Sequence, residues 1–133
     1  MKKVALVLTL LIGFTLSSLS QKRERMKSEL VSYKYKQDST WYDWDNWGES
    51  KVKIIHDIKN DRFKIKDREE KIYIILESLE KRQDDVGDEI LEWSCVNSDG
   101  QKCIIKIVTL NSFDKEKQFY IEYSYKKISY HLR

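Results

Sequence analysis

The chain has 133 residues, 41% of them hydrophobic and 35% charged, with no proline, four glycines and a net charge of +3. This length favours one compact domain over two, and a composition poor in proline and glycine excludes a disordered linker. The small net charge excludes nucleic acid as the expected partner, because binding to phosphates requires a concentrated basic face.

The first residues have the order of a secretory signal peptide. Lys2 and Lys3 precede an apolar run over residues 4–16, and serines occupy positions −3 and −1 of a cut before Gln21. The run is shorter than the ~20 residues that span a bilayer, so a cleaved leader is favoured over a retained anchor. No cysteine stands near the cut to carry a lipid.

We therefore predict a signal peptide at residues 1–20 and a single β domain at residues 21–133. The working protein is expected in the periplasm or outside the cell, with no transmembrane segment after cleavage. Loss of both leader lysines lowers the net charge by two, which weakens the case for a nucleic-acid partner further. An oxidising compartment also permits a disulfide.

Aromatic and β-branched residues then alternate with polar ones, which is typical of half-buried strands. Residues 31–35 are predicted as one strand and the tryptophan-rich residues 41–47 as another. Residues 21–29 are too charged to assign and are interpreted as a frayed or helical lead-in.

The next two alternating segments, 52–58 and 62–66, flank a polar pair at residues 60–61. A two-residue turn at that pair places the apolar side chains of both segments on one face, as a hairpin requires. The register that this turn predicts pairs Ile58 with Phe63 and His56 with Ile65.

The rest of the chain continues the series of strands. Residues 71–76 are apolar at every position and are predicted to be covered on both faces, whereas residues 77–88 form a long polar connection. A second hairpin and two strands separated by a turn or bulge follow at residues 90–96, 101–110, 118–125 and 128–132. About eight short strands predict an all-β protein, a single antiparallel meander that forms a small barrel or a sandwich.

Cys95 and Cys103 flank the turn of the second hairpin. A three-residue loop at residues 98–100, with Gly100 in a left-handed conformation, places the two cysteines directly opposite each other. A two-residue turn at residues 99–100 would instead send them to opposite faces. In a secreted protein we predict a structural disulfide, because a redox dithiol usually has Cys-x-x-Cys spacing and zinc requires two further ligands.

Residues 95–112, CVNSDGQKCIIKIVTLNS, together with the aromatic strand that follows, resemble a group of small secreted bacterial proteins with no assigned function. The resemblance covers about the last third of the chain and rests on the Cys-turn-Gly-Cys and Leu-Asn-Ser patterns. It implies an extracytoplasmic β protein and carries no activity.

Residues 41–49 are the second notable segment. Trp41, Tyr42, Trp44 and Trp47 are a candidate binding surface, because exposed rings stack on sugars and anchor protein partners. The alternative is packing at a barrel end. The acids of this segment resemble the start of a calcium loop, but an EF-hand would need oxygen ligands where tryptophan and isoleucine stand, so no metal is predicted. An irregular calcium site remains open for Asp43, Asp45 and Glu49.

The remaining polar residues predict no catalytic site. His56 is expected in the core and His131 near a fraying end, so no nucleophile and base are brought together. Paired acids at residues 84–85 and 88–89 are expected to be solvated loop charge. The sequence thus favours a non-catalytic binding or interaction module, such as an inhibitor or surface-associated protein, with an unknown protein or carbohydrate partner and no cofactor. The alternative is a small-molecule carrier with a calycin-like barrel cavity.

Overall fold

Strands form all the regular structure in the computed structural model, which describes residues 23–112 and 115–132. The predicted signal peptide lies outside the described residues. The strands are β1 (Arg23–Gln37), β2 (Thr40–Trp41), β3 (Gly48–Glu49), β4 (Lys53–Asp57), β5 (Arg62–Lys66), β6 (Glu70–Ser78), β7 (Arg82–Gln83), β8 (Glu89–Asn97), β9 (Lys102–Thr109), β10 (Lys117–Glu122) and β11 (Lys126–Leu132). The described residues contain no helix with the length and apolar character needed to cross a membrane.

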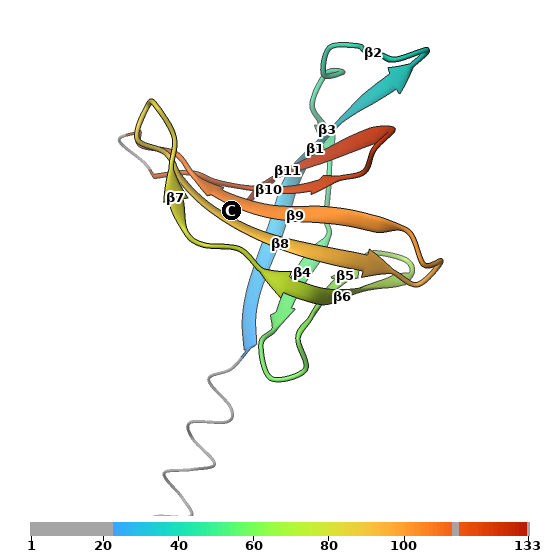
Figure 1. Ribbon diagram of the computed structural model, residues 1–133, viewed down its shortest axis with the longest axis vertical. Helices are drawn as coiled ribbons and strands as arrows, with labels where there is room; N and C mark the ends of the chain where they lie inside the picture. The colour runs from blue at the N-terminus through green and yellow to red at the C-terminus, as the bar shows by residue number, and fades with distance from the viewer. Residues whose placement is uncertain (1–22, 113–114, 133) are drawn as a thin grey trace, which may run out of the picture.

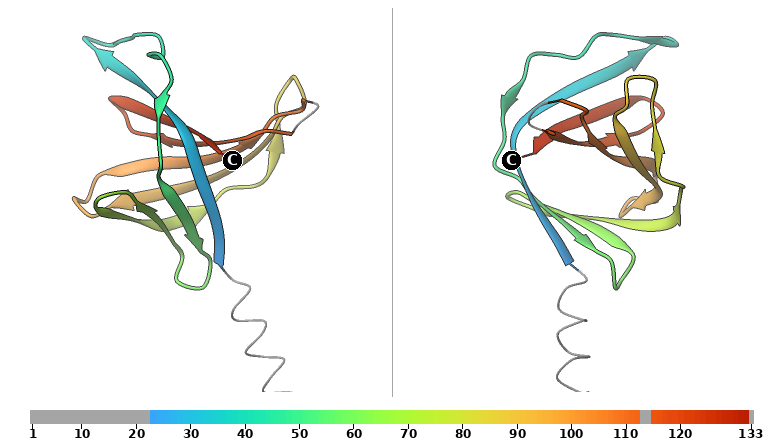
Figure 2. Two further views of the ribbon diagram at one scale, coloured as in Figure 1. Left: turned by 180° about the vertical axis from the view of Figure 1, so that it is seen from behind. Right: turned by 90° about the vertical axis from the view of Figure 1, so that its left-hand side faces the viewer.

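Eight of these strands form a closed antiparallel barrel. They follow the order β11-β10-β9-β8-β6-β5-β4-β1, and β1 pairs with β11 to complete the ring (Figures 1 and 2). The right-hand view of Figure 2 shows this ring nearly along its axis. The predicted all-β antiparallel meander is therefore confirmed, in its barrel form, and closure leaves no open edge on the ring.

β1 closes the barrel because its first part pairs with β4 and its second part pairs with β11. Its first residues, 23–27, pair with β4, and from Ser28 the strand pairs with β11, with a bulge between Ser28 and Leu30. The prediction that residues 21–29 are frayed or helical is thus wrong for residues 23–29. Charged side chains do not prevent a strand here, because the backbone groups of β4 require a partner and the charges remain exposed to solvent.

One half of the barrel interior is tightly packed. Its fully buried side chains include Ile54, Phe63, Phe119 and Ile121. His56 is buried among them, as predicted, and its ring stacks on Phe63 with centroids 4.3 Å apart. Burial lowers the pKa of His56, because the charged imidazole would lose its hydration there. This half is an aromatic and aliphatic core.

The hairpin of β4 and β5 forms with a different register from the predicted one. His56 pairs with Phe63, and Asp57 with Arg62, so the loop contains four residues, 58–61. The predicted register paired Phe63 with Ile58, whereas the observed register pairs it with His56, two residues earlier. A shift of two residues keeps the apolar side chains on the predicted face. It leaves Ile58 in the loop, where it is exposed. Asp57 stabilises the observed four-residue loop, because its buried carboxylate accepts hydrogen bonds from Asn60 and Arg62 across the loop.

β6 is covered on one face only, so the prediction for residues 71–76 is wrong. Tyr73 faces the core, whereas Ile74 is 53% exposed on the outer face. Leu76 follows Ile74 by two residues and is exposed on the same outer face, and a bulge after Ile75 interrupts the pairing with β8. An apolar run cannot distinguish a strand between two layers from a barrel strand whose outer face is apolar but uncovered.

The connection at residues 77–88 is more regular than predicted. It contains the end of β6 and the short strand β7, which pairs with the start of β8. Oδ1 of Asp84 accepts hydrogen bonds from the backbone N–H groups of Val86 and Asp88 at 3.1 and 2.9 Å. This acid therefore orders the loop.

The hairpin of β8 and β9 has the predicted register, with Cys95 opposite Cys103 and Gly100 at a φ of 80°. The predicted disulfide, however, is not formed: both cysteines are free and buried. Asn97 donates its backbone N–H to Gln101 at 2.9 Å, so the cysteine pair two residues further on again occupies a hydrogen-bonded position. Hydrogen-bonded pairs have Cα atoms about 5.5 Å apart, a spacing that disulfides also use, so the backbone position does not by itself explain why the bond is absent.

We expect neither thiol to react in the folded protein. Burial raises the pKa of Cys95 to about 12 and that of Cys103 to about 11, so almost no thiolate exists at neutral pH. Iodoacetamide at pH 8 should add no mass to the native protein and two adducts in urea, as measured by intact-mass spectrometry. Adducts on the native chain, or none after unfolding without reductant, would contradict this assignment.

Candidate functional site

A cavity opens where β1 leaves β4. The two strands pair only as far as Lys27 and Lys53, and the chain at residues 50–52 spans the space beyond. Two backbone hydrogen bonds of 2.9 Å hold this segment to β1, from Ser50 to Glu29 and from Ser28 to Val52. Behind it lies a half-open cavity of about 580 Å³ beside the β5–β6 turn.

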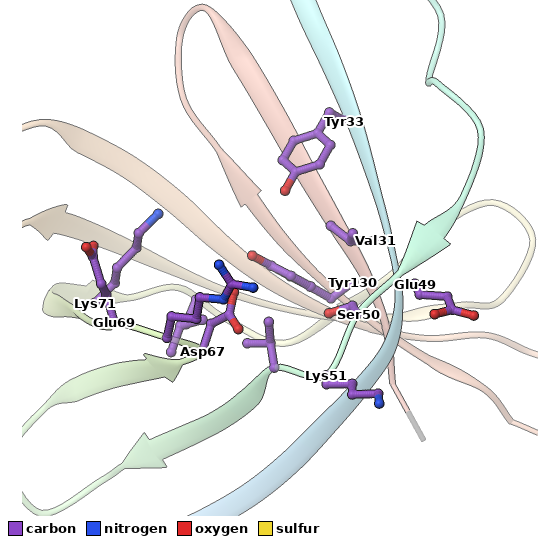
Figure 3. Close-up of a pocket in the computed structure, with 12 residues that line it drawn as sticks. Val31, Tyr33, Glu49, Ser50, Lys51, Asp67, Glu69, Lys71 and Tyr130 are labelled. Atoms are coloured by element: carbon purple, nitrogen blue, oxygen red, sulfur yellow. The ribbon is translucent and has the colours of Figure 1, made fainter.

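The inner wall of the cavity combines apolar surface with unpaired hydroxyl groups. Val31, Val52 and Ile65 supply the apolar part, and Tyr33 and Tyr130 direct their rings into the space (Figure 3). Neither tyrosine hydroxyl makes a hydrogen bond to any residue that the structure describes. The buried Oγ of Ser50, also in this wall, likewise has no partner among the described residues.

Burial raises the pKa of both tyrosines, and charge adds to the effect. For Tyr130 the further causes are Tyr33, Asp67 and Tyr123, and for Tyr33 they are Tyr35, Asp45 and Asp67. Both hydroxyls are therefore neutral donors at physiological pH. The carboxylate of Asp67 is close enough to both hydroxyls to affect them without being hydrogen-bonded to either.

Charged residues surround the opening of the cavity. Three acids and three bases line it: Glu49, Lys51, Asp67, Arg68, Glu69 and Lys71. None of the six forms an ion pair with another residue in the described part of the chain. Cavities with apolar walls and a few convergent polar groups bind small molecules, and those of this volume can enclose one. The arrangement is suited to non-covalent binding.

The tryptophan segment lies elsewhere, on the outside of the barrel. The predicted strand at residues 41–47 is wrong beyond Trp41, because residues 42–47 form an irregular crossing between β2 and β3. Asp45 holds this crossing against β1: its Oδ1 accepts the backbone N–H of Tyr33 at 2.8 Å. The carbonyl oxygen of Asp45 also accepts a hydrogen bond from the buried Ser32 hydroxyl at 2.8 Å.

The crossing brings the predicted aromatic residues onto one outer surface but leaves them apart from the cavity. Trp44 packs edge-on against Tyr120 of β10, and Trp47 against His131 of β11. Trp41 lies beside the ammonium group of Lys127, 4.8 Å from its ring centroid. Tyr42, Trp44 and Trp47 keep 55%, 37% and 46% of their surface exposed. Each tryptophan therefore buries part of its surface against the barrel and leaves the rest exposed to solvent.

The acids of this segment, Asp43, Asp45 and Glu49, are not gathered into one group in the structure. The described residues contain no group of three acidic, histidine or cysteine side chains placed to hold a metal ion. The carboxylate of Asp45 is already used by the backbone of β1.

Replacing Asp45 by alanine is expected to release the crossing from β1. Loss of its hydrogen bonds should lower the free energy of unfolding by about 1 kcal/mol. It should also move tryptophan fluorescence to longer wavelength, as Trp44 and Trp47 gain exposure. Asp43→Ala is the matched control, because its side chain makes no hydrogen bond to the described residues. Equal effects of both variants would contradict the role of Asp45.

The sequence did not indicate the cavity. Tyr33 was placed on a strand and Tyr130 beyond a turn, but no local pattern shows that β1 and β11 become neighbours. Ser50 and Asp67 lie in connections of ordinary composition, and only tertiary structure brings them to one space.

No protein-family model, no curated protein and no solved structure matches this chain. The resemblance of residues 95–112 to small secreted bacterial proteins stays a prediction.

Proposed function

We propose that this protein is a non-catalytic binding protein that holds a small molecule in the cavity between β1 and the β5–β6 turn. The observation that carries the proposal is the buried Oγ of Ser50, which has no hydrogen-bond partner among the described residues and lines a space of about 580 Å³ together with Tyr33 and Tyr130. Buried polar groups are nearly always hydrogen-bonded, so this hydroxyl supports a partner that binds there. The packed half of the barrel supplies a rigid support.

A cavity-filling variant tests this proposal. Val31→Trp places a large ring in the cavity wall, and Ile74→Trp adds the same ring to the outer face as a control. Native mass spectrometry of protein purified from its source should reveal a bound small molecule in the wild type and in Ile74→Trp, and none in Val31→Trp. A fragment screen by ligand-observed NMR should give the same pattern. A wild type that binds nothing in both measurements would refute the proposal.

We also propose the tryptophan segment as a contact surface for a protein or carbohydrate partner. The exposure that Tyr42 and Trp47 keep after packing supports it. The double variant Tyr42→Ala/Trp47→Ala should lose binding on a glycan array or to a cross-linked partner protein while its unfolding transition is retained. Unchanged binding by this variant would contradict the proposal.

A location outside the cytoplasm is proposed from the leader sequence alone. Cell fractionation and N-terminal sequencing should find a mature chain that begins at Gln21. An uncleaved chain in the cytoplasm would contradict it.

A further inference from the structure

The buried wall of the cavity and its opening differ in charge. The buried lining residues are Val52, Ile65 and Tyr130, which keep only 8%, 4% and 8% of their surface exposed. The charged lining residues are all exposed to solvent, and Arg68 stands next to Asp67 in the chain, so the opening favours neither sign of charge. They are Glu49, Lys51, Asp67, Arg68, Glu69 and Lys71.

Tyr130 supplies a hydrogen-bonding group to the buried wall. More than nine-tenths of the residue is buried, yet its hydroxyl makes no hydrogen bond to any residue that the structure describes. Tyr33 is its diagonal neighbour, because Val31 of β1 pairs with Tyr130 of β11. In Figure 3 both rings direct their hydroxyl ends into the same part of the cavity. Two O–H donors without protein partners therefore converge there.

An uncharged carbonyl group matches this arrangement. A carbonyl oxygen has two lone pairs and can accept one hydrogen bond from each phenol. An ionised group at the same depth would lose its hydration, and the buried part of the described lining holds no charged side chain to compensate it. The apolar surface of Val31, Val52 and Ile65 remains for the rest of the ligand.

We propose that the cavity selects uncharged small molecules that carry a carbonyl group on an apolar body, with the carbonyl oxygen held by the hydroxyls of Tyr130 and Tyr33. This inference rests on the proposed binding function, because it assigns the ligand class of the same cavity. The burial of the wall decides the selection, and the charged residues of the opening stay in water.

Three ligands of nearly equal shape test the inference: 4-phenyl-2-butanone, the corresponding amine 4-phenylbutan-2-amine, and 3-phenylpropionate. At pH 7 the ketone is neutral, the amine is a cation and the propionate is an anion. Titrations followed by protein NMR should give binding of the ketone that is at least about tenfold tighter than that of either ion.

Two variants test the part of the tyrosines. Tyr130→Phe keeps the ring and should weaken ketone binding about fivefold, the equivalent of one hydrogen bond. The infrared carbonyl stretch of the bound, isotopically labelled ketone should rise in wavenumber in Tyr33→Phe/Tyr130→Phe, which loss of packing alone would not cause. Tyr125→Phe is the control, because Tyr125 is exposed and lies outside the cavity lining.

The outcomes separate the inference from the proposed function. The ligand class is wrong, and the cavity remains a binding site, if either ion binds as tightly as the ketone or if the fragment screen yields ligands but the ketone does not bind. It is also wrong if the tyrosine variants leave affinity and carbonyl stretch unchanged. If none of the three ligands binds and the fragment screen on the wild type is empty, both are wrong. A ketone preference that depends on Tyr130 and persists in Tyr125→Phe supports both.

Discussion

Replacing Phe63 by alanine is expected to lower the free energy of unfolding by about 3–5 kcal/mol, since the vacated space in a packed core cannot collapse fully. Phe63 is completely buried and lies at the centre of the aromatic core. Its ring stacks on His56 and meets Trp93 and Phe119 edge-on, at centroid distances of 5.0 and 5.5 Å. Urea unfolding followed by circular dichroism measures the loss.

Two further variants keep this prediction testable if the alanine variant does not fold. Phe63→Leu retains most of the volume and should cost less than the alanine change. Ile74→Ala removes an apolar side chain of β6 from the exposed outer face, and a change within about 0.5 kcal/mol is expected. A loss at Phe63 no larger than that at Ile74 would show that the core is not organised around this ring.

Replacing Asp57 by asparagine is expected to destabilise the protein by about 2 kcal/mol, because hydrogen bonds to a buried charged group contribute more than neutral ones. The carboxylate accepts hydrogen bonds from Asn60 at 2.9 Å and Arg62 at 3.2 Å, and Arg23 stands 4.0 Å away. An amide in its place would direct N–H groups toward the same donors. Asp85→Asn, in the exposed loop after β7, is the control and should have little effect.

The destabilisation by Asp57→Asn should depend on pH. The hydrogen bond from Asn60, with that from Arg62, holds the pKa of Asp57 below its usual range and outweighs the opposing effect of burial. A carboxyl group with a lowered pKa stabilises the fold above its unfolded-state value of about 4, and this contribution disappears as the pH falls through the folded-state pKa. Wild type and variant should therefore converge in stability at low pH. A constant difference from pH 7 to pH 2 would exclude this role.

The sequence predicted those features that depend on local chemistry. The three-residue turn with Gly100 in the left-handed position predicted the observed register of β8 and β9, in preference to a two-residue turn at residues 99–100. The disulfide predicted between the cysteines is absent although their register is the predicted one, because facing positions alone do not join two thiols. A pattern of apolar residues defines a face but does not define which backbone groups are paired.

Features that depend on distant segments were missed. The predicted β4–β5 register was wrong because the sequence does not show that Asp57 is buried and hydrogen-bonded to Asn60 and Arg62. The exposure of Ile74 follows from a barrel whose outer wall is uncovered at that point. The cavity itself exists because β1 changes partner between Lys27 and Ser28, and no short window of sequence contains both partners.

The pairing of β1 with β11 also has a consequence for how the chain folds. Ser28 and Leu132 are partners although about 100 residues separate them, and contacts of such high sequence separation slow folding because the entropy of loop closure must be overcome first. The meander from β4 to β10 can assemble through neighbouring hairpins, but the ring cannot close before β11 has been synthesised. Until then β4 and β10 each present an unpaired strand edge, the state in which this protein is most exposed to aggregation.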